Sequence, residues 1–229
     1  MRRAALSVLA LAGCDVVFRV DHVPDAPAGD AVTADALSIC TLPFIDDTFD
    51  DGTPCAPWGS PRMQVGGTVT ESNGSIIVQP APNMIGSRGG CDAMGAVPFG
   101  TGGVVAEVSH AMGGSDAEFT LLASGSLQLA VAVANNQIVF QNDIGTIQYG
   151  AAILYVPTAM RFWRIRRFND VVITGEYSAD GVAWTELGRQ TVALAPTTAN
   201  FGLLAGLNNN RPAQSAPDRS VYDRFVVCP

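Results

Sequence analysis

Short segments in which apolar and polar residues alternate fill this chain from residue 75 onward. A period of two puts successive side chains on opposite faces of a β-strand, and such segments are typical of strands with one buried face. No window of a dozen residues keeps a 3.6-residue period free of Gly or Pro, so helices should be few and short. The segments are 75–80, 103–111, 118–123, 127–134, 137–142, 151–156, 161–168, 170–178, 184–192, 200–206 and 221–227.

Turn-forming residues separate these segments. They include Asn135-Asn136, Asn169-Asp170, Asp180-Gly181 and the run 208–210, which suit tight connections between antiparallel strands. The chain has 24 glycines, no lysine and only five glutamates, a composition that disfavours long helices. The sequence therefore predicts an all-β fold of about a dozen antiparallel strands in a two-sheet sandwich.

The first residues have the features of an export signal. Arg2 and Arg3 precede an apolar run at 4–13, which as a helix would span about 15 Å, half of a bilayer core. Leu11-Ala12-Gly13-Cys14 resembles the bacterial lipobox, which implies a signal peptide at 1–13 and lipid modification of Cys14. The alternative is an ordinary secretory signal that happens to contain Cys14.

A low-complexity segment follows the signal. Residues 15–38 consist mainly of Asp, Ala, Pro and Val, with five Asp against one Arg and one His. Such a composition cannot bury a core, so residues 14–39 are expected to form a disordered acidic tether. The folded domain would then span 40–229. This organisation predicts an exported lipoprotein of the bacterial cell envelope, either periplasmic or on the cell surface, with the membrane as a partner.

The charge balance excludes one class of partner. With 13 basic residues against 21 acidic ones, the formal net charge is −8. A surface of this sign repels phosphate backbones, so nucleic acid is not expected as a ligand.

Four cysteines remain after Cys14: Cys40, Cys55, Cys91 and Cys228. An even number in an exported chain indicates two disulfides, for which three pairings are possible. A four-cysteine zinc site is disfavoured because no two cysteines have the CxxC spacing.

Several stretches resemble the concanavalin A-like jelly roll, and most closely its bacterial laminin G-like and glucanase-like extracellular members. These stretches are "FIDDTFDDG" (44–52), "GSIIVQPAP" (74–82), "RFWRIRRFNDVVITGEYSADGVAWTEL" (161–187), "FGLLAGLNNN" (201–210) and "VYDRFVV" (221–227). The resemblance covers residues 44–229 and is strongest at 161–187. It implies two curved sheets in which the first and last strands are neighbours.

That adjacency favours one disulfide pairing. A Cys40–Cys228 bridge would tie the start of the domain to its last strand. Its companion, Cys55–Cys91, would close a loop of about 37 residues and contribute roughly 4 kcal/mol in the chain-entropy model.

The stretch "EYSADGVAW" (176–184) has two interpretations. It is similar to the Asp-box of sialidases, but that motif usually places one residue between Asp and Gly, and it repeats. Here Asp180 and Gly181 are adjacent and the stretch occurs once. We therefore expect a hairpin turn in which Ser178 and Asp180 cap the backbone and Tyr177 and Trp184 bury their rings.

An arginine cluster offers a candidate binding surface. The two-residue period in a strand at 161–168 puts one set of residues on one face, Phe162, Arg164, Arg166 and Phe168. The other face has Arg161, Trp163, Ile165 and Arg167. Arg164 and Arg166 could bind the carboxylates of an acidic glycan, with aromatic rings beside them. Alternatively, they pair with acids of neighbouring strands, Glu176 or Glu186. Trp58 is either a core residue or an exposed platform for a sugar ring.

The catalytic motif of related glucanases is missing. Those enzymes carry two glutamates on one strand as E-x-D-x-E, and none of the five glutamates here has that spacing. They are Glu71, Glu107, Glu118, Glu176 and Glu186. A Ser–His–Asp triad would need His110, because His22 lies in the tether. We therefore expect no enzyme, but a protein that binds carbohydrate or another surface component. The alternatives are a divergent glycoside hydrolase or polysaccharide lyase, and a structural envelope protein without a small ligand.

No cofactor is required by these patterns, although a structural Ca²⁺ is a possibility. Asp46, Asp47, Asp50 and Asp51 cluster near the first predicted strand, and related sandwiches often hold Ca²⁺ through Asp and backbone oxygens. The EF-hand spacing is absent.

Overall fold

The structure is a computed structural model that describes residues 39–112, 116–122, 127–142, 147–207 and 213–229. For residues 116–122 only the strand and its pairing are described. The chain divides into two units, and the second, Leu37–Pro229, contains all of these residues. The predicted signal peptide, Cys14, almost all of the predicted tether and the turn at 208–210 lie outside the described residues.

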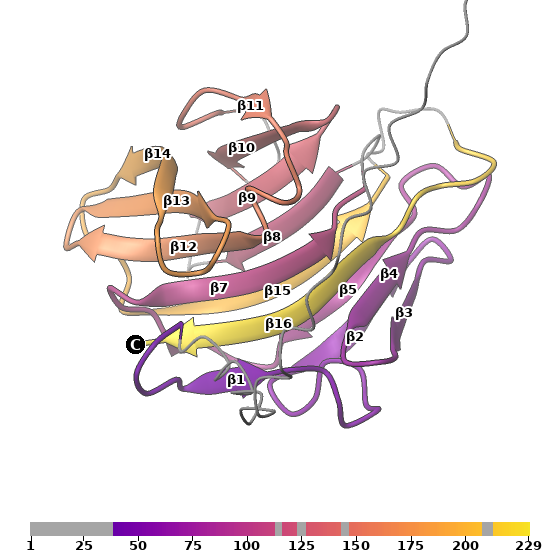
Figure 1. Cartoon of the computed structure of the whole chain (residues 1–229), viewed down its shortest axis with the longest axis horizontal. Helices are drawn as coiled ribbons and strands as arrows, with labels where there is room; N and C mark the ends of the chain where they lie inside the picture. The colour runs from indigo at the N-terminus through magenta and orange to yellow at the C-terminus, as the bar shows by residue number, and fades with distance from the viewer. Residues whose placement is uncertain (1–38, 113–115, 123–126, 143–146, 208–212) are drawn as a thin grey trace, which may run out of the picture. The chain divides into compact units, whose positions relative to one another are not determined.

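Two antiparallel sheets form the domain (Figure 1). In the first, called sheet A, the strand order is β14-β13-β12-β7-β16-β4-β3, and β1 pairs with β16. Its strands are β1 (Ile45–Asp47), β3 (Thr68–Glu71), β4 (Ile76–Gln79), β7 (Gly103–His110), β12 (Phe162–Asn169), β13 (Val172–Ser178), β14 (Thr185–Thr191) and β16 (Ser220–Cys228).

In the second, called sheet B, the order is β11-β10-β9-β8-β15-β5-β2, and β6 pairs with β15. Its strands are β2 (Gly59–Gln64), β5 (Arg88–Ala93), β6 (Val97–Pro98), β8 (Asp116–Leu122), β9 (Gln128–Ala134), β10 (Gln137–Asn142), β11 (Ile153–Leu154) and β15 (Thr198–Gly206). The all-β, two-sheet architecture expected from the sequence is therefore confirmed. Across the described residues there is no helix that could cross a membrane.

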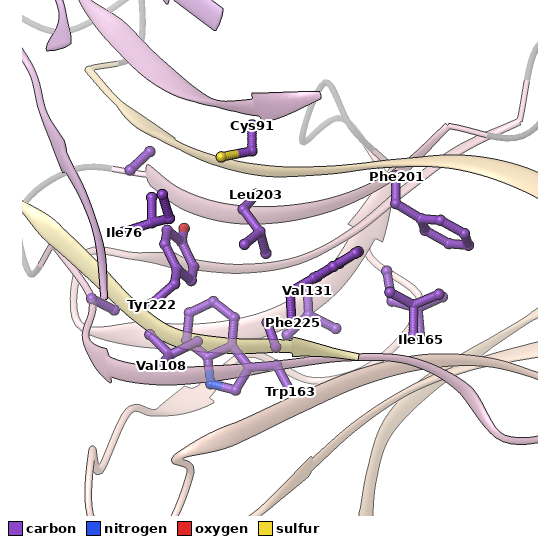
Figure 2. Close-up of a cluster of buried hydrophobic side chains, with 14 of the residues drawn as sticks. Ile76, Cys91, Val108, Val131, Trp163, Ile165, Phe201, Leu203, Tyr222 and Phe225 are labelled. Atoms are coloured by element: carbon purple, nitrogen blue, oxygen red, sulfur yellow. The ribbon is translucent and has the colours of Figure 1, made fainter. Parts of the chain in front are cut away.

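The core lies between the two sheets, because each sheet turns one face of alternating apolar residues inward. On β12 these are Trp163 and Ile165, which meet Val131 of β9 and Leu203 of β15 in one buried cluster (Figure 2). Tyr222 of β16 is also fully buried, and its hydroxyl donates to the carbonyl of Leu204 at 2.7 Å. Its polar group is thus satisfied inside an otherwise apolar layer.

The ends of the domain are joined as expected. Strand β1 pairs antiparallel with β16, so the first and last strands are neighbours. Disulfides connect Cys40 with Cys228 and Cys55 with Cys91, which confirms the preferred pairing.

Candidate functional site

The β13–β14 hairpin contains the stretch that resembled an Asp-box. Ser178 Oγ accepts from the backbone N–H groups of Asp180 and Gly181 at 3.2 and 3.0 Å. The Asp180 carboxylate accepts from those of Val182 and Ala183, both at 2.9 Å, and these bonds lower the pKa of Asp180. Gly181 has a φ of 74°, which glycine adopts without strain. The stretch is therefore a structural turn, as predicted.

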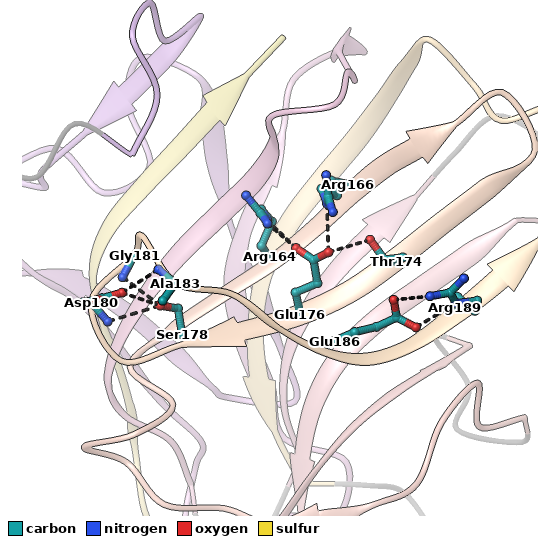
Figure 3. Close-up of polar contacts among 10 residues, drawn as sticks. All are labelled: Arg164, Arg166, Thr174, Glu176, Ser178, Asp180, Gly181, Ala183, Glu186 and Arg189. Atoms are coloured by element: carbon teal, nitrogen blue, oxygen red, sulfur yellow. Dashed lines mark hydrogen bonds and ion pairs between the residues drawn. The ribbon is translucent and has the colours of Figure 1, made fainter.

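Arg164 and Arg166 lie on the outer face of sheet A and converge on Glu176 of β13 (Figure 3). Their Nε atoms donate to the two oxygens of this carboxylate at 2.7 and 2.8 Å. Thr174 Oγ1 donates to the same carboxylate at 3.0 Å, and Glu176 is only 4% exposed. The Arg164 guanidinium also lies 3.9 Å from the centre of the Trp184 ring. The outer arginines are therefore paired with a strand acid, one of the two outcomes expected.

Burial lowers the pKa of Arg164, while the charge of Glu176 opposes this effect. Glu186, the other acid considered, instead accepts from Arg189 of its own strand at 2.8 Å (Figure 3). The two guanidinium groups of the Arg164–Glu176–Arg166 cluster thus share one buried carboxylate.

Trp58 is a core residue. It is 6% exposed, its ring stacks on that of Phe225 with centroids 4.1 Å apart, and its indole N–H donates to Asp47 at 2.7 Å. A ring in this position is covered and does not offer a face on which a sugar could stack.

Three of the four acidic residues proposed for Ca²⁺, all but Asp50, accept hydrogen bonds from the protein. Asp46 accepts two hydrogen bonds from Arg224, both at 2.7 Å, Asp47 accepts from Trp58, and Asp51 accepts from the backbone N–H of Thr53 at 2.7 Å. Within the described part of the chain, no group of three or more His, Cys, Asp or Glu side chains is arranged to hold a metal ion.

A pair of carboxylates lies on the outer face of sheet A. Glu107 of β7 and Asp223 of β16 both contact Nη2 of Arg161, Asp223 at 3.9 Å. The Glu107 side chain is 13% exposed, and burial raises its pKa. Asp223 accepts from the hydroxyls of Ser75 and Ser109 at 2.8 and 2.9 Å. The sequence had pointed to Glu107 but not to Asp223.

Among the described residues, His110 does not form a Ser–His–Asp triad with its neighbours. His110 pairs with the carboxylate of Asp218 at 2.9 Å, whereas the hydroxyl of its neighbour Ser109 donates to Asp223. Glu118 lies outside the residues whose side chains are described.

A cavity of about 640 Å³ lies beside the segment that connects β14 to β15. Its described lining residues are Leu127, Arg167, Gln190, Thr191, Val192, Ala193, Leu194, Ala195, Pro196, Thr197 and Thr198. Its volume lies within the range of about 300–1,000 Å³ found for small-molecule sites. The connecting segment is anchored, because Val192 N–H donates to the carbonyl of Val171 at 2.8 Å and Ala195 N–H to that of Asp170 at 2.7 Å.

Arg167 is the charged residue of this lining. It continues the inward-facing series of Trp163 and Ile165 and pairs in register with the buried Ile173, as the two-residue period predicts. Its side chain is 20% exposed, and Nη2 donates to Asp170, which is 81% exposed. The Nε atom is buried and has no hydrogen-bond acceptor among the described residues. An inward-facing arginine at the end of the sandwich therefore retains one unused buried donor.

No family model matches the chain, and a search of curated proteins finds no match. Solved structures do match. SCLam, a non-specific endo-β-1,3(4)-glucanase from family GH16, has a TM-score of 0.59 at 10% identity, covering 81% of this chain and 89% of that chain. A laminarinase from Flavobacterium sp. UMI-01 has a TM-score of 0.59 at 9% identity, and the match covers 82% of this chain and 100% of that chain. The seed lectin of Lotus tetragonolobus has a TM-score of 0.51 at 12% identity, and the match covers 80% of this chain and 96% of that chain.

The fold is the concanavalin A-like jelly roll. This confirms the resemblance stated from the sequence, and at these identities it concerns the fold alone. The expectation that the chain is not an enzyme is contradicted, because the solved structures with this fold include two glucan-cleaving enzymes as well as a lectin. That expectation rested on one missing motif, E-x-D-x-E, which excludes one arrangement of acids on one strand and not enzymes in general.

Within this jelly roll, two groups of residues offer chemistry. The Glu107–Arg161–Asp223 group lies on the outer face of sheet A, and the Arg167 cavity lies at the end of β12. The Arg164–Glu176–Arg166 cluster and Trp58 serve the domain's own packing.

Proposed function

We propose that this chain is a lipid-anchored protein of the bacterial cell envelope whose jelly-roll domain binds a carbohydrate in the Arg167 cavity. The observation that carries the proposal is the cavity itself. It combines an anchored wall, the side chains of Thr191, Thr197 and Gln190, and the partly exposed guanidinium of Arg167. A hollow that presents polar groups beside aliphatic side chains suits both the hydroxyls and the apolar ring faces of a sugar.

The neighbours support a carbohydrate as the ligand class. A glucanase, a laminarinase and a seed lectin share this fold at low identity, so glycans are the first ligands to test. Binding should be measured on a glycan array with the full-length chain purified in detergent. Leu194→Trp is the matched blocking variant, because Leu194 is exposed and lines the cavity. Retained binding after this substitution would place the site elsewhere. Silence on the array together with a co-purifying envelope protein would favour the structural alternative.

Anchoring rests on the lipobox at Leu11–Cys14, and export is supported by the two disulfides, which persist outside the reducing cytosol. Replacing Cys14 with serine removes the thiol that would be acylated. We expect Cys14→Ser to move the protein from the membrane to the soluble fraction. If the variant stays in the membrane fraction, lipid attachment at Cys14 is refuted.

A second candidate function, glycan hydrolysis, is favoured by the Glu107–Asp223 pair. Burial raises the pKa of Glu107, which suits a proton donor, and a second carboxylate, that of Asp223, is held nearby by two serine hydroxyls and Arg161. Sugar release from polymeric glycans tests this role. Glu107→Gln should abolish release, whereas Glu186→Gln, on the exposed pair with Arg189, should not. Equal release by both variants would eliminate Glu107 as the acid.

A further inference from the structure

We infer that the Arg167 cavity selects a carbohydrate that carries a carboxylate, such as a uronic acid, over the corresponding neutral sugar. The inference rests on the proposed function and adds the chemical class of the ligand. It is carried by the charge, burial and hydrogen bonding of Arg167.

Charge is the first consideration. Among the described residues that line the cavity, Arg167 alone is charged, and the others are aliphatic residues, threonines and a glutamine. Its ion-pair partner Asp170 is 81% exposed, and ion pairs with such solvent-exposed groups are weak. The cavity therefore holds a positive charge that is not matched on its inner side. An anionic group of the ligand would complement it in a partly desolvated setting.

Hydrogen bonding is the second consideration. Arg167 Nε is buried and lacks an acceptor in the described part of the chain. Because Nε has no surface open to a ligand, an anion in the cavity would bond to guanidinium N–H groups on the exposed part of the Arg167 side chain, which is 20% exposed. A carboxylate can accept from two guanidinium N–H groups at once, and its bonds to arginine are stronger than those of a neutral hydroxyl. The Arg167 guanidinium therefore discriminates between a uronate and its neutral counterpart.

Preorganisation is the third consideration. Arg167 N–H donates to the carbonyl of Gly100 at 3.1 Å, and Val192 and Ala195 fix the opposite wall to the 170–171 turn. With both walls fixed by backbone bonds, little ordering free energy is lost when a ligand enters. The outer pair Arg164 and Arg166 lie on the other face of β12, where they donate to Glu176, and they do not line this cavity.

The test compares matched sugars and matched arginines. Trimers of galacturonate and of mannuronate are titrated into the full-length chain by calorimetry, beside the same trimers with each carboxylate reduced to an alcohol. The wild-type chain should bind at least one uronate about tenfold or more tightly than its reduced form. Arg167→Gln should remove this preference. Arg189→Gln, which removes an equal charge from the exposed pair with Glu186, should keep it. Thermal melting verifies that each variant is folded.

Three outcomes are distinguishable. A uronate preference that depends on Arg167 and is lost in Leu194→Trp supports the inference. Equal binding of acidic and reduced trimers, blocked by Leu194→Trp and unchanged by Arg167→Gln, overturns the inference and leaves the proposed function standing. Failure of all trimers to bind overturns the inference, and the proposed function falls with it only if the glycan array also shows no binding.

Discussion

Removal of the Glu176 carboxylate tests whether the outer arginines of sheet A are structural. Glu176 is buried and binds Arg164, Arg166 and Thr174. Glu176→Ala would leave two guanidinium groups without their acceptor. Breaking a buried ion pair in this way costs about 3–5 kcal/mol. Because the Arg166 side chain is 25% exposed to water, we expect the loss of unfolding free energy to be at the lower end of this range, about 3 kcal/mol. For a domain of this size that equals a fall in Tm of about 6–12 °C.

The assay is thermal unfolding followed by circular dichroism, with urea unfolding to obtain the free energy. Glu186→Ala is the control, because its pair with Arg189 is exposed and should change stability by no more than about 0.5 kcal/mol. The reasoning is refuted if the two variants melt at the same temperature. In that case Glu176 would contribute no more than a surface acid, and Arg164 and Arg166 would again be candidates for ligand binding.

Two further substitutions test other parts of the domain. Burial raises the pKa of Glu71. Its Oε1 atom accepts a hydrogen bond from Gly52 N–H, whereas its buried Oε2 atom has no hydrogen-bond donor among the described residues. Because the pKa of Glu71 is raised in the folded state, its ionisation lowers the unfolding free energy as the pH rises above the ordinary pKa of about 4.3. Below that pH the carboxyl is protonated in both states and the loss disappears. Glu71→Gln should therefore stabilise by about 0.5–1 kcal/mol near pH 7, and a gain that persisted near pH 3 in urea unfolding would contradict this. Replacing Cys55 and Cys91 with serine should lower the unfolding free energy by roughly 4 kcal/mol, and an unchanged urea midpoint would show that their bridge does not constrain the unfolded chain.

The fold was predictable because its main determinant is local. The two-residue period on 161–168 assigns Trp163 and Ile165 to the core and Arg164 and Arg166 to the outer face, and the structure has this arrangement. The turns were predictable for the same reason. Asn135 and Asn136 both have positive φ, of 52° and 59°, which the connection between β9 and β10 requires.

The candidate sites were predictable only in part, because they depend on contacts between distant segments. Glu107 and Asp223 are brought together by the pairing of β7 with β16, and no spacing in the sequence indicates that pairing in register. The position of Trp58 depended on Phe225 and Asp47, which a composition argument could not place beside it. Arg167 was the one feature of the sequence that could have indicated the cavity, because the two-residue period places this charged residue on the core-facing side of β12.

The three arginines of β12 show why ligand selection would reside at the end of the sandwich and not on its face. Arg164 and Arg166 share the buried carboxylate of Glu176, which holds both guanidinium groups against the outer face of the sheet. Arg167 is turned the other way and has only the exposed Asp170. The chain as a whole carries −8, and its repulsion of anions is screened beyond about 8 Å at physiological ionic strength. An attraction inside a partly buried cavity is screened much less. A large polyanion such as nucleic acid would therefore be repelled by the net negative charge of the surface, whereas a single carboxylate that enters the cavity would be attracted by Arg167.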